Sequence, residues 1–157
     1  MIDKINILVN VIFTVILLYI SINDFRKKKI TNRSLAVLLL IGIGAACQLQ
    51  VTVLERILGV LVTGTPLLLL DLILPGAFGG GDIKLLAIAG GLLGWRGGLL
   101  ALCAGFLSGG FYSAVMLVLG KIKRKDKFAF GPFLCIGIAI GYCIIFVNSQ
   151  SSGLTVY

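Results

Sequence analysis

The sequence predicts an all-α, polytopic membrane protein with six transmembrane helices and both termini outside (N-out/C-out). Of its 157 residues, 59% are hydrophobic and 13% are charged, whereas soluble domains are about 45–50% apolar and about 25% charged. At about 20 residues for each span, six spans use about 120 residues. Since little chain then remains for a soluble domain, we expect residues 1–157 to form a single integral membrane domain.

Six apolar segments carry this prediction, and each ends near charged, polar or glycine-rich residues. In order they are Ile5–Ile22, Leu35–Gln48, Leu54–Leu74, Ile83–Trp95, Gly97–Gly120 and Phe128–Val147. Many of the 21 glycines lie within or beside these segments, and small residues let helices approach closely in lipid. We therefore interpret most of these glycines as packing positions.

The fourth segment, Ile83–Trp95, is the shortest. Its 13 residues rise only about 20 Å as a helix, whereas the hydrocarbon core is about 30 Å thick. Either the helix starts earlier, or its cytoplasmic end lies beneath the headgroups. The second arrangement would place the preceding glycine-rich turn at membrane depth, which requires a protein-lined or watery cavity. We expect a functional site there.

The basic residues predict the orientation. The chain has 14 Lys and Arg against 6 Asp and Glu, and ten of the basic residues fall in two clusters, Arg26–Arg33 and Lys121–Lys127. Cytoplasmic loops of membrane proteins are rich in Lys and Arg. With the N-terminus outside, six spans place eleven of the 14 on the cytoplasmic side, and removing one span would separate the two clusters. We interpret the net charge as orientation and contact with anionic lipids, not as nucleic-acid binding.

The composition also limits the chemistry. There is no His, and the four cysteines are spread through apolar runs without a C-x-x-C pair, whereas zinc sites usually show closely spaced ligands. We interpret the cysteines as buried apolar thiols. We therefore expect no metal and no cofactor, and a catalyst in this chain has to use other groups.

Acidic residues near the bilayer core are costly and are candidates for function. Three of the six acids lie beside basic residues and are interpreted as surface charges: Asp3, Glu55 and Asp126. The other three are Asp24, Asp71 and Asp82.

Two of these acids are predicted to meet. Asp24 closes the first span and Asp82 opens the fourth, so the topology places both at the cytoplasmic surface. Two carboxyl groups held close together share one proton. The ionised group can then deprotonate water while the other donates a proton to a peptide carbonyl. The alternative is two unrelated acids, with Asp24 solvated beside Arg26–Lys29.

Three consecutive glycines, Gly79–Gly81, precede Asp82 and permit close approach of another chain segment. The helix dipole favours an anion at Asp82, at a helix N-terminus, and disfavours one at Asp24, at a helix C-terminus. We therefore expect Asp82 to ionise more readily. The alternative is a helix cap with a flexible turn. The spacing to Lys84 does not fit a phosphate-binding loop.

Three motifs resemble the type IV prepilin peptidase family, whose members are membrane aspartic proteases that cleave leader peptides from pilin-like precursors. Gly79–Lys84 is similar to the G-x-G-D-x-K signature of that family. Asp24–Asn32 resembles its first aspartate motif, with Thr31 in place of the usual Pro, and Phe130–Leu134 matches its F-G-P-F-L segment. The resemblance covers nearly the whole chain with the motifs in the expected order.

This resemblance implies that Asp24 and Asp82 are a metal-free catalytic pair. It also implies a bacterial inner (cytoplasmic) membrane protein that cleaves prepilin-like membrane substrates at the cytoplasmic face. Supporting roles are expected for four residues, and one further acid is a candidate accessory group: Gly79, Gly81, Lys84 and Asn32, and Asp71. We interpret Phe130–Leu134 as structural.

Longer members of the family carry an N-terminal region with paired cysteines, associated with methylation of the new N-terminus. This sequence begins directly at the first predicted span, so we expect peptidase activity without methyltransferase activity. Neither the pilin that is cleaved nor the oligomeric state follows from the sequence.

Two other functions stay open at this point. A small ion-coupled carrier could use the aspartates as a cation path, although the paired broken helices of an inverted repeat are not visible in the sequence. A non-enzymatic assembly subunit is the third hypothesis, and the retained aspartates argue against it.

Overall fold

The computed structural model describes residues 2–27, 30–75, 79–120 and 130–154. These residues form five α-helical elements and no strand: α1 (Ile2–Lys27), α2 (Asn32–Ala46), α3 (Val53–Ile73), α4 (Gly80–Val118) and α5 (Gly131–Leu154). The all-α prediction is therefore confirmed for this part of the chain. Outside the described residues lie positions 128 and 129 of the last predicted apolar segment and the whole second basic cluster, with Asp126 inside it.

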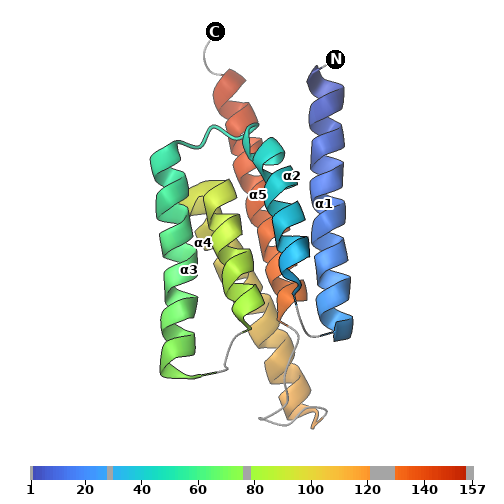
Figure 1. The fold of residues 1–157 in the computed structure, drawn as a ribbon, viewed down its shortest axis with the longest axis vertical. Coiled ribbons are helices and arrows are strands. Elements are labelled where there is room, and N and C mark those ends of the chain that lie inside the picture. Colours follow the sequence, from blue (N-terminus) through green and yellow to red (C-terminus); the bar gives the residue numbers. More distant parts are fainter. Residues whose placement is uncertain (1, 28–29, 76–78, 121–129, 155–157) are drawn as a thin grey trace.

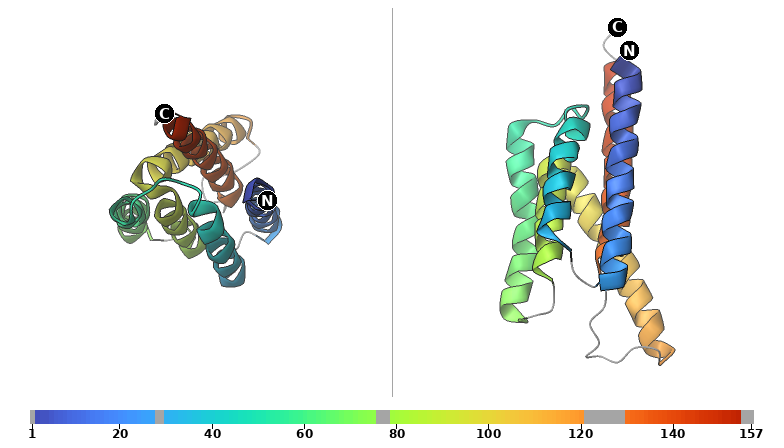
Figure 2. Two further views of the ribbon diagram at one scale, coloured as in Figure 1. Left: turned by 90° about the horizontal axis from the view of Figure 1, so that it is seen from above. Right: turned by 45° about the vertical axis from the view of Figure 1, so that its right-hand side comes forward.

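The helices run alternately along one axis (Figure 1). Both termini lie at one end of the bundle, and the C-terminal ends of α1 and α3 lie at the other, with the beginnings of α2, α4 and α5 (Figures 1 and 2). The carboxyl end of α1 and the amino end of α4 are therefore brought to the same end, as the predicted topology requires of Asp24 and Asp82.

A break inside α4 reverses the chain direction (Figure 1). Gly94 has φ 73° and ψ 177°, a conformation that side chains with a Cβ rarely adopt. The break falls beside the boundary predicted between Ile83–Trp95 and Gly97–Gly120. It divides the 39-residue element into two helical runs, and the second run extends beyond the rest of the bundle (Figure 2).

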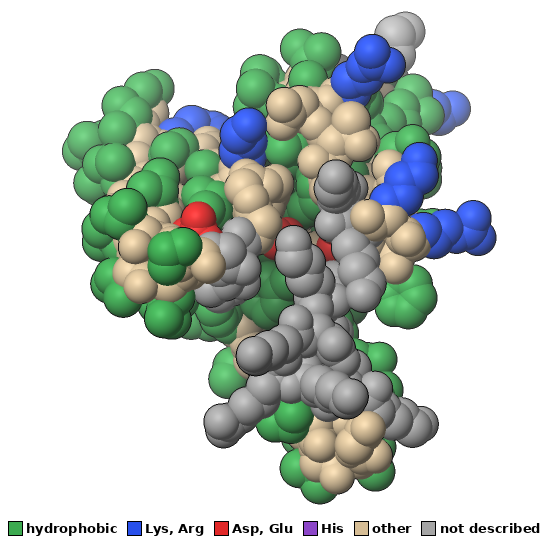
Figure 3. All heavy atoms as spheres, turned by 60° about the horizontal axis from the view of Figure 1, so that its bottom comes forward, with side chains coloured by type: hydrophobic (Ala, Val, Ile, Leu, Met, Phe, Trp, Pro, Cys, Tyr) green, Lys and Arg blue, Asp and Glu red, His purple; other side chains and the backbone are tan. Residues whose placement is uncertain are grey.

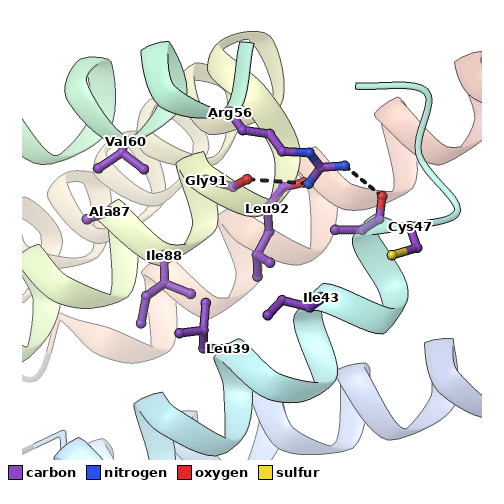
Figure 4. A pocket seen from close by; sticks show the side chains of 10 residues that line it. Leu39, Ile43, Cys47, Arg56, Val60, Ala87, Ile88, Gly91 and Leu92 are labelled. Carbon is purple, nitrogen blue, oxygen red and sulfur yellow. Dashed lines mark hydrogen bonds between the residues drawn. The ribbon is translucent and has the colours of Figure 1, made fainter. Parts of the chain in front are cut away.

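Arg56, near the start of α3, stabilises this break through hydrogen bonds. Its guanidinium donates hydrogen bonds to the carbonyl oxygens of Leu92 at 2.9 Å and Gly91 at 3.4 Å, and to that of Ala46 at 2.9 Å (Figure 4). A helix that stops leaves its last carbonyls without donors, and Arg56 supplies donors both to the interrupted helix and to the end of α2.

Small residues lie where neighbouring helices approach each other most closely. A Cβ at Gly59 of α3 would overlap the Gly90 carbonyl of α4, and the fully buried Thr63 hydroxyl lies 2.8 Å from the carbonyl oxygens of Gly59 and Leu86. Between α4 and α5, a Cβ at Gly137 would overlap the Ala101 carbonyl. The interpretation of these glycines as packing positions is thus supported by contacts that leave no room for a methyl group.

Four helices in the described part are long and apolar enough to cross a membrane: Lys4–Lys27, Val53–Ile73, Gly80–Val118 and Gly131–Ser151. The fifth, Asn32–Ala46, is apolar but shorter. The chain is therefore a multi-pass membrane protein by helix length and composition, while the count of six spans and the N-out/C-out orientation stay predictions. Many large apolar side chains face outward, for example Leu107 and Phe111, each 75% exposed.

Candidate active site

Asp24 lies in the last turn of α1, and its side chain points into the bundle. The residue is only 5% exposed, although Phe25, Arg26 and Lys27 beside it are exposed. Its Oδ2 accepts a hydrogen bond of 3.0 Å from the backbone N–H of Gly131, the first residue of α5. The solvated alternative, in which Asp24 pairs with the neighbouring basic run, does not describe this geometry.

Asp82 lies in the first turn of α4, behind the N-cap residue Gly79. It is 9% exposed, and the Gly79 backbone is hydrogen-bonded to its carboxyl group. An acidic side chain at this position commonly accepts a bond from the N-cap N–H. Its Oδ1 is buried and has no hydrogen-bond partner within the described part of the chain. One oxygen of the Asp82 carboxyl group thus accepts a hydrogen bond from the backbone, and the other accepts none from the described residues.

The two carboxyl groups are close enough to interact electrostatically, although 58 positions separate them in the sequence. The buried Cys135, on the second turn of α5, interacts with both. Three helices therefore meet at the aspartate pair, which we define as Asp24 and Asp82. Figure 3 shows this end of the molecule, with acidic side chains in the middle of the face and Lys and Arg spread over the upper part and the right side of the view.

The carboxyl group of each aspartate meets the amino end of a helix, which removes the basis for the expected order of ionisation. That order assumed that Asp24 meets the carboxyl end of α1. Its carboxylate instead meets the positive end of α5, and Asp82 meets the positive end of α4. The dipole argument therefore does not distinguish them, because each carboxyl group accepts a backbone N–H at a helix start.

Two of the predicted supporting residues contact each other. Lys84 Nζ donates a hydrogen bond of 3.3 Å to Asn32 Oδ1, which joins the second turn of α4 to the first residue of α2. Both side chains are exposed. This bond links the two motifs beside the aspartate pair, and it places Lys84 on the surface.

The predicted glycines make room for neighbours. A Cβ at Gly81 would lie 2.8 Å from Ile30 Cβ, so the segment before α2 passes directly against it. A Cβ at Gly79 would lie 3.1 Å from Asp82 Oδ2, whereas Gly80 has no heavy atom within 4 Å of that position. Close approach of the protein's own segment before α2 therefore requires glycine at position 81, and the supporting roles of Gly79 and Gly81 stay predictions.

Asp71 lies in the last turns of α3, half-buried, at the same end of the bundle as the aspartate pair. Its role as an accessory group stays a prediction. No three His, Cys, Asp or Glu side chains among the described residues are grouped to hold a metal ion.

An apolar groove of about 520 Å³ lies away from the aspartate pair, between α2, α3 and α4 (Figure 4). None of the residues predicted for the site lines it. Its wall consists of Leu39, Ile43, Ala46, Cys47, Arg56, Val60, Ala87, Ile88, Gly91 and Leu92.

Sequence reasoning missed two neighbours of the aspartate pair, the Gly131 N–H and the Cys135 thiol. Every residue except proline has a backbone N–H group, so the sequence does not show which of them donates to a site. The available signal was indirect: α5 starts at Phe130-Gly131-Pro132, without the Ser, Thr, Asp or Asn that usually caps a helix, so a cap had to come from elsewhere.

The sequence model of the type IV leader peptidase family matches residues 11–114, which include both aspartates. The "Prepilin leader peptidase/N-methyltransferase" of Bacillus subtilis (strain 168) is 28% identical over 135 residues, which is 84% of this chain and 54% of that protein. The chain thus spans about half the length of this curated relative. No solved structure matches significantly.

Proposed function

Because the chain belongs to the type IV leader peptidase family, we propose that it is a membrane aspartic endopeptidase that removes the leader peptide from prepilin-like precursors. One observation carries the proposal: Asp24 and Asp82, far apart in the sequence, are both buried and interact electrostatically at one end of the bundle.

The proposed chemistry needs only the aspartate pair and water. Two adjacent carboxyl groups hold one proton between them. The ionised group takes a proton from water, and the protonated group donates its hydrogen bond to the scissile carbonyl oxygen. The water oxygen adds to the carbonyl carbon, and the tetrahedral intermediate collapses when the leaving amine receives a proton from the pair. The carboxyl groups finish with the same single proton between them.

The proposed topology is one domain with six membrane crossings and both termini outside. It is supported by the termini, which lie at one end of the bundle (Figure 1), and by the break at Gly94, which splits α4 into two antiparallel runs. The run before Gly94 rises only about 20 Å, which is less than the hydrocarbon core of about 30 Å. We infer that the aspartate pair is recessed from the cytoplasmic surface of a bacterial inner membrane.

The proposed substrate lies with its apolar helix in the bilayer and its leader junction across the aspartate pair. A small residue before the scissile bond, Gly in the family, would admit the backbone between Asp24 and Asp82. The basic residues at this end would contact anionic lipids. We propose cleavage without methylation for this chain, whose four cysteines include no C-x-x-C pair.

Co-expression with a candidate prepilin tests this function, with the intact mass of the substrate as the readout. We expect the wild type to release the leader with no added methyl group, and Asp24→Asn and Asp82→Asn to abolish release while inserting normally. Glu55→Gln is the matched control, because Glu55 belongs to a capping box at the opposite end of the bundle. Unchanged release by either aspartate variant would refute the proposed pair.

A further inference from the structure

The amino end of α5 has no capping side chain of its own. The N–H groups of Phe133 and Leu134 both donate to the Phe130 carbonyl, at 3.1 and 3.3 Å, and Pro132 has no N–H. The remaining donor of the first turn is the Gly131 N–H, and Asp24 Oδ2 accepts it at 3.0 Å. Asp24 therefore caps a helix that lies 107 positions further along the chain.

The contact leaves no space for a side chain at position 131. A Cβ there would lie 2.5 Å from Asp24 Oδ2 and 2.8 Å from Asp24 Cγ, which is well inside van der Waals contact. Any residue other than glycine would have to displace the Asp24 carboxyl group or move the start of α5.

The start of α5 is itself held against α4 on both sides of Gly131. The Phe130 ring packs edge-on against the Phe106 ring, with centroids 5.1 Å apart, and its atoms fill the space where a Cβ of Gly109 would lie. On the other side, the Phe133 ring lies 5.3 Å from the Tyr112 ring. The fully buried Leu134 packs in the same way over Gly105.

We propose that the amino end of α5 is a positioning element of the aspartate pair, in which the Gly131 N–H fixes the orientation of the Asp24 carboxyl group. This inference rests on the proposed function. Oδ2 is held by Gly131, so Oδ1 is the oxygen available to water or to the shared proton. Phe130–Leu134, interpreted from the sequence as structural, thereby acquires a role in the reaction: its aromatic and apolar side chains anchor the backbone that orients Asp24.

The kinetic test compares three glycine substitutions in the full-length protein. Gly131→Ala is expected to lower kcat about 100-fold, the usual cost of a displacement of about 1 Å at a catalytic group, with KM for the prepilin unchanged. Gly110→Ala, which meets no atom within 4 Å, should match the wild type. Gly137→Ala strains the packing of α5 against Ala101, so it should lower stability and leave kcat of the folded protein unchanged.

A purely structural role predicts a different pattern. A kcat for Gly131→Ala within threefold of the wild type would overturn the proposal, and so would an equal loss of kcat in Gly137→Ala at equal folded fraction.

Amide hydrogen exchange at Gly131 tests the contact without any substrate. The amide should be protected in the wild type and in Asp24→Asn, whose side-chain carbonyl still accepts the bond, and should exchange at least tenfold faster in Asp24→Ala. Equal exchange in Asp24→Ala and the wild type would overturn the proposal even if Gly131→Ala does not fold. Protection that depends on Asp24 in a protein that cleaves no prepilin would instead refute the proposed function and leave the contact established.

Discussion

The hydrogen bonds of the Arg56 guanidinium predict a large loss of stability when this group is removed. Two of its hydrogen bonds, to Leu92 and Ala46, are 2.9 Å long, and the third, to Gly91, is 3.4 Å. Hydrogen bonds to charged groups contribute about 1.5–3 kcal/mol each. The site is only half-buried, so we take the lower value for the two short bonds and nothing for the long one. Arg56→Met should therefore cost about 3 kcal/mol.

The matched control is Arg96→Met, which removes an arginine from the same end of the bundle. Arg96 is exposed, and its guanidinium lies 5.3 Å from the Trp95 ring centroid, an interaction of about 0.5–1 kcal/mol at exposed sites. Arg56→Lys should fall between the two methionine variants, because one ammonium group does not reproduce the two-armed geometry of a guanidinium.

Reversible denaturant unfolding in mild detergent, followed by far-UV circular dichroism, measures these differences. The reasoning is refuted if the free energies of unfolding of Arg56→Met and Arg96→Met differ by less than about 1 kcal/mol. The hydrogen bonds of Arg56 would then contribute no more than an exposed cation does.

Three further predictions concern Thr63, Lys84 and the proposed metal-free chemistry. Thr63→Val should cost about 1–2 kcal/mol in the same unfolding assay, because it removes the buried hydroxyl that bonds the Gly59 or Leu86 carbonyl; no change would refute that contact. Lys84→Ala should alter kcat less than about fivefold, because its bond to Asn32 is exposed and long and such bonds contribute about 1 kcal/mol or less; a loss of about 100-fold would give Lys84 a direct role. Cleavage by the purified enzyme should be undiminished by a chelator, and loss that Zn²⁺ restores would contradict the metal-free chemistry.

The meeting of Asp24 and Asp82 was predictable from the sequence. It followed from the count of basic residues on each side, because that count predicts which helix ends share a membrane face. The structure places both helix ends at one end of the bundle, and the two carboxyl groups interact there.

The contacts that hold the pair were not predictable in the same way. The Gly131 N–H belongs to the backbone, and its contact with Asp24 exists only because α5 packs beside α1. Gly94 is one of 21 glycines, and nothing local separates the one that reverses the chain from those that pack. The role of Arg56 was not visible in the sequence, because the carbonyls to which it donates become free only where Gly94 interrupts the helix. In an apolar helix surrounded by lipid, the sequence also lacks the polar face that would show which side packs inward.

The central claim is that one aspartate from α1 and one from α4 together cleave a prepilin. The most direct measurement is the rate of leader release from a purified prepilin by the purified wild type, Asp24→Asn and Asp82→Asn in liposomes, followed by intact mass. The account predicts that each variant, folded and inserted as the wild type is, loses at least about 10³-fold in rate, within the range contributed by acid–base catalysts. Release by either variant at a rate within tenfold of the wild type would contradict it.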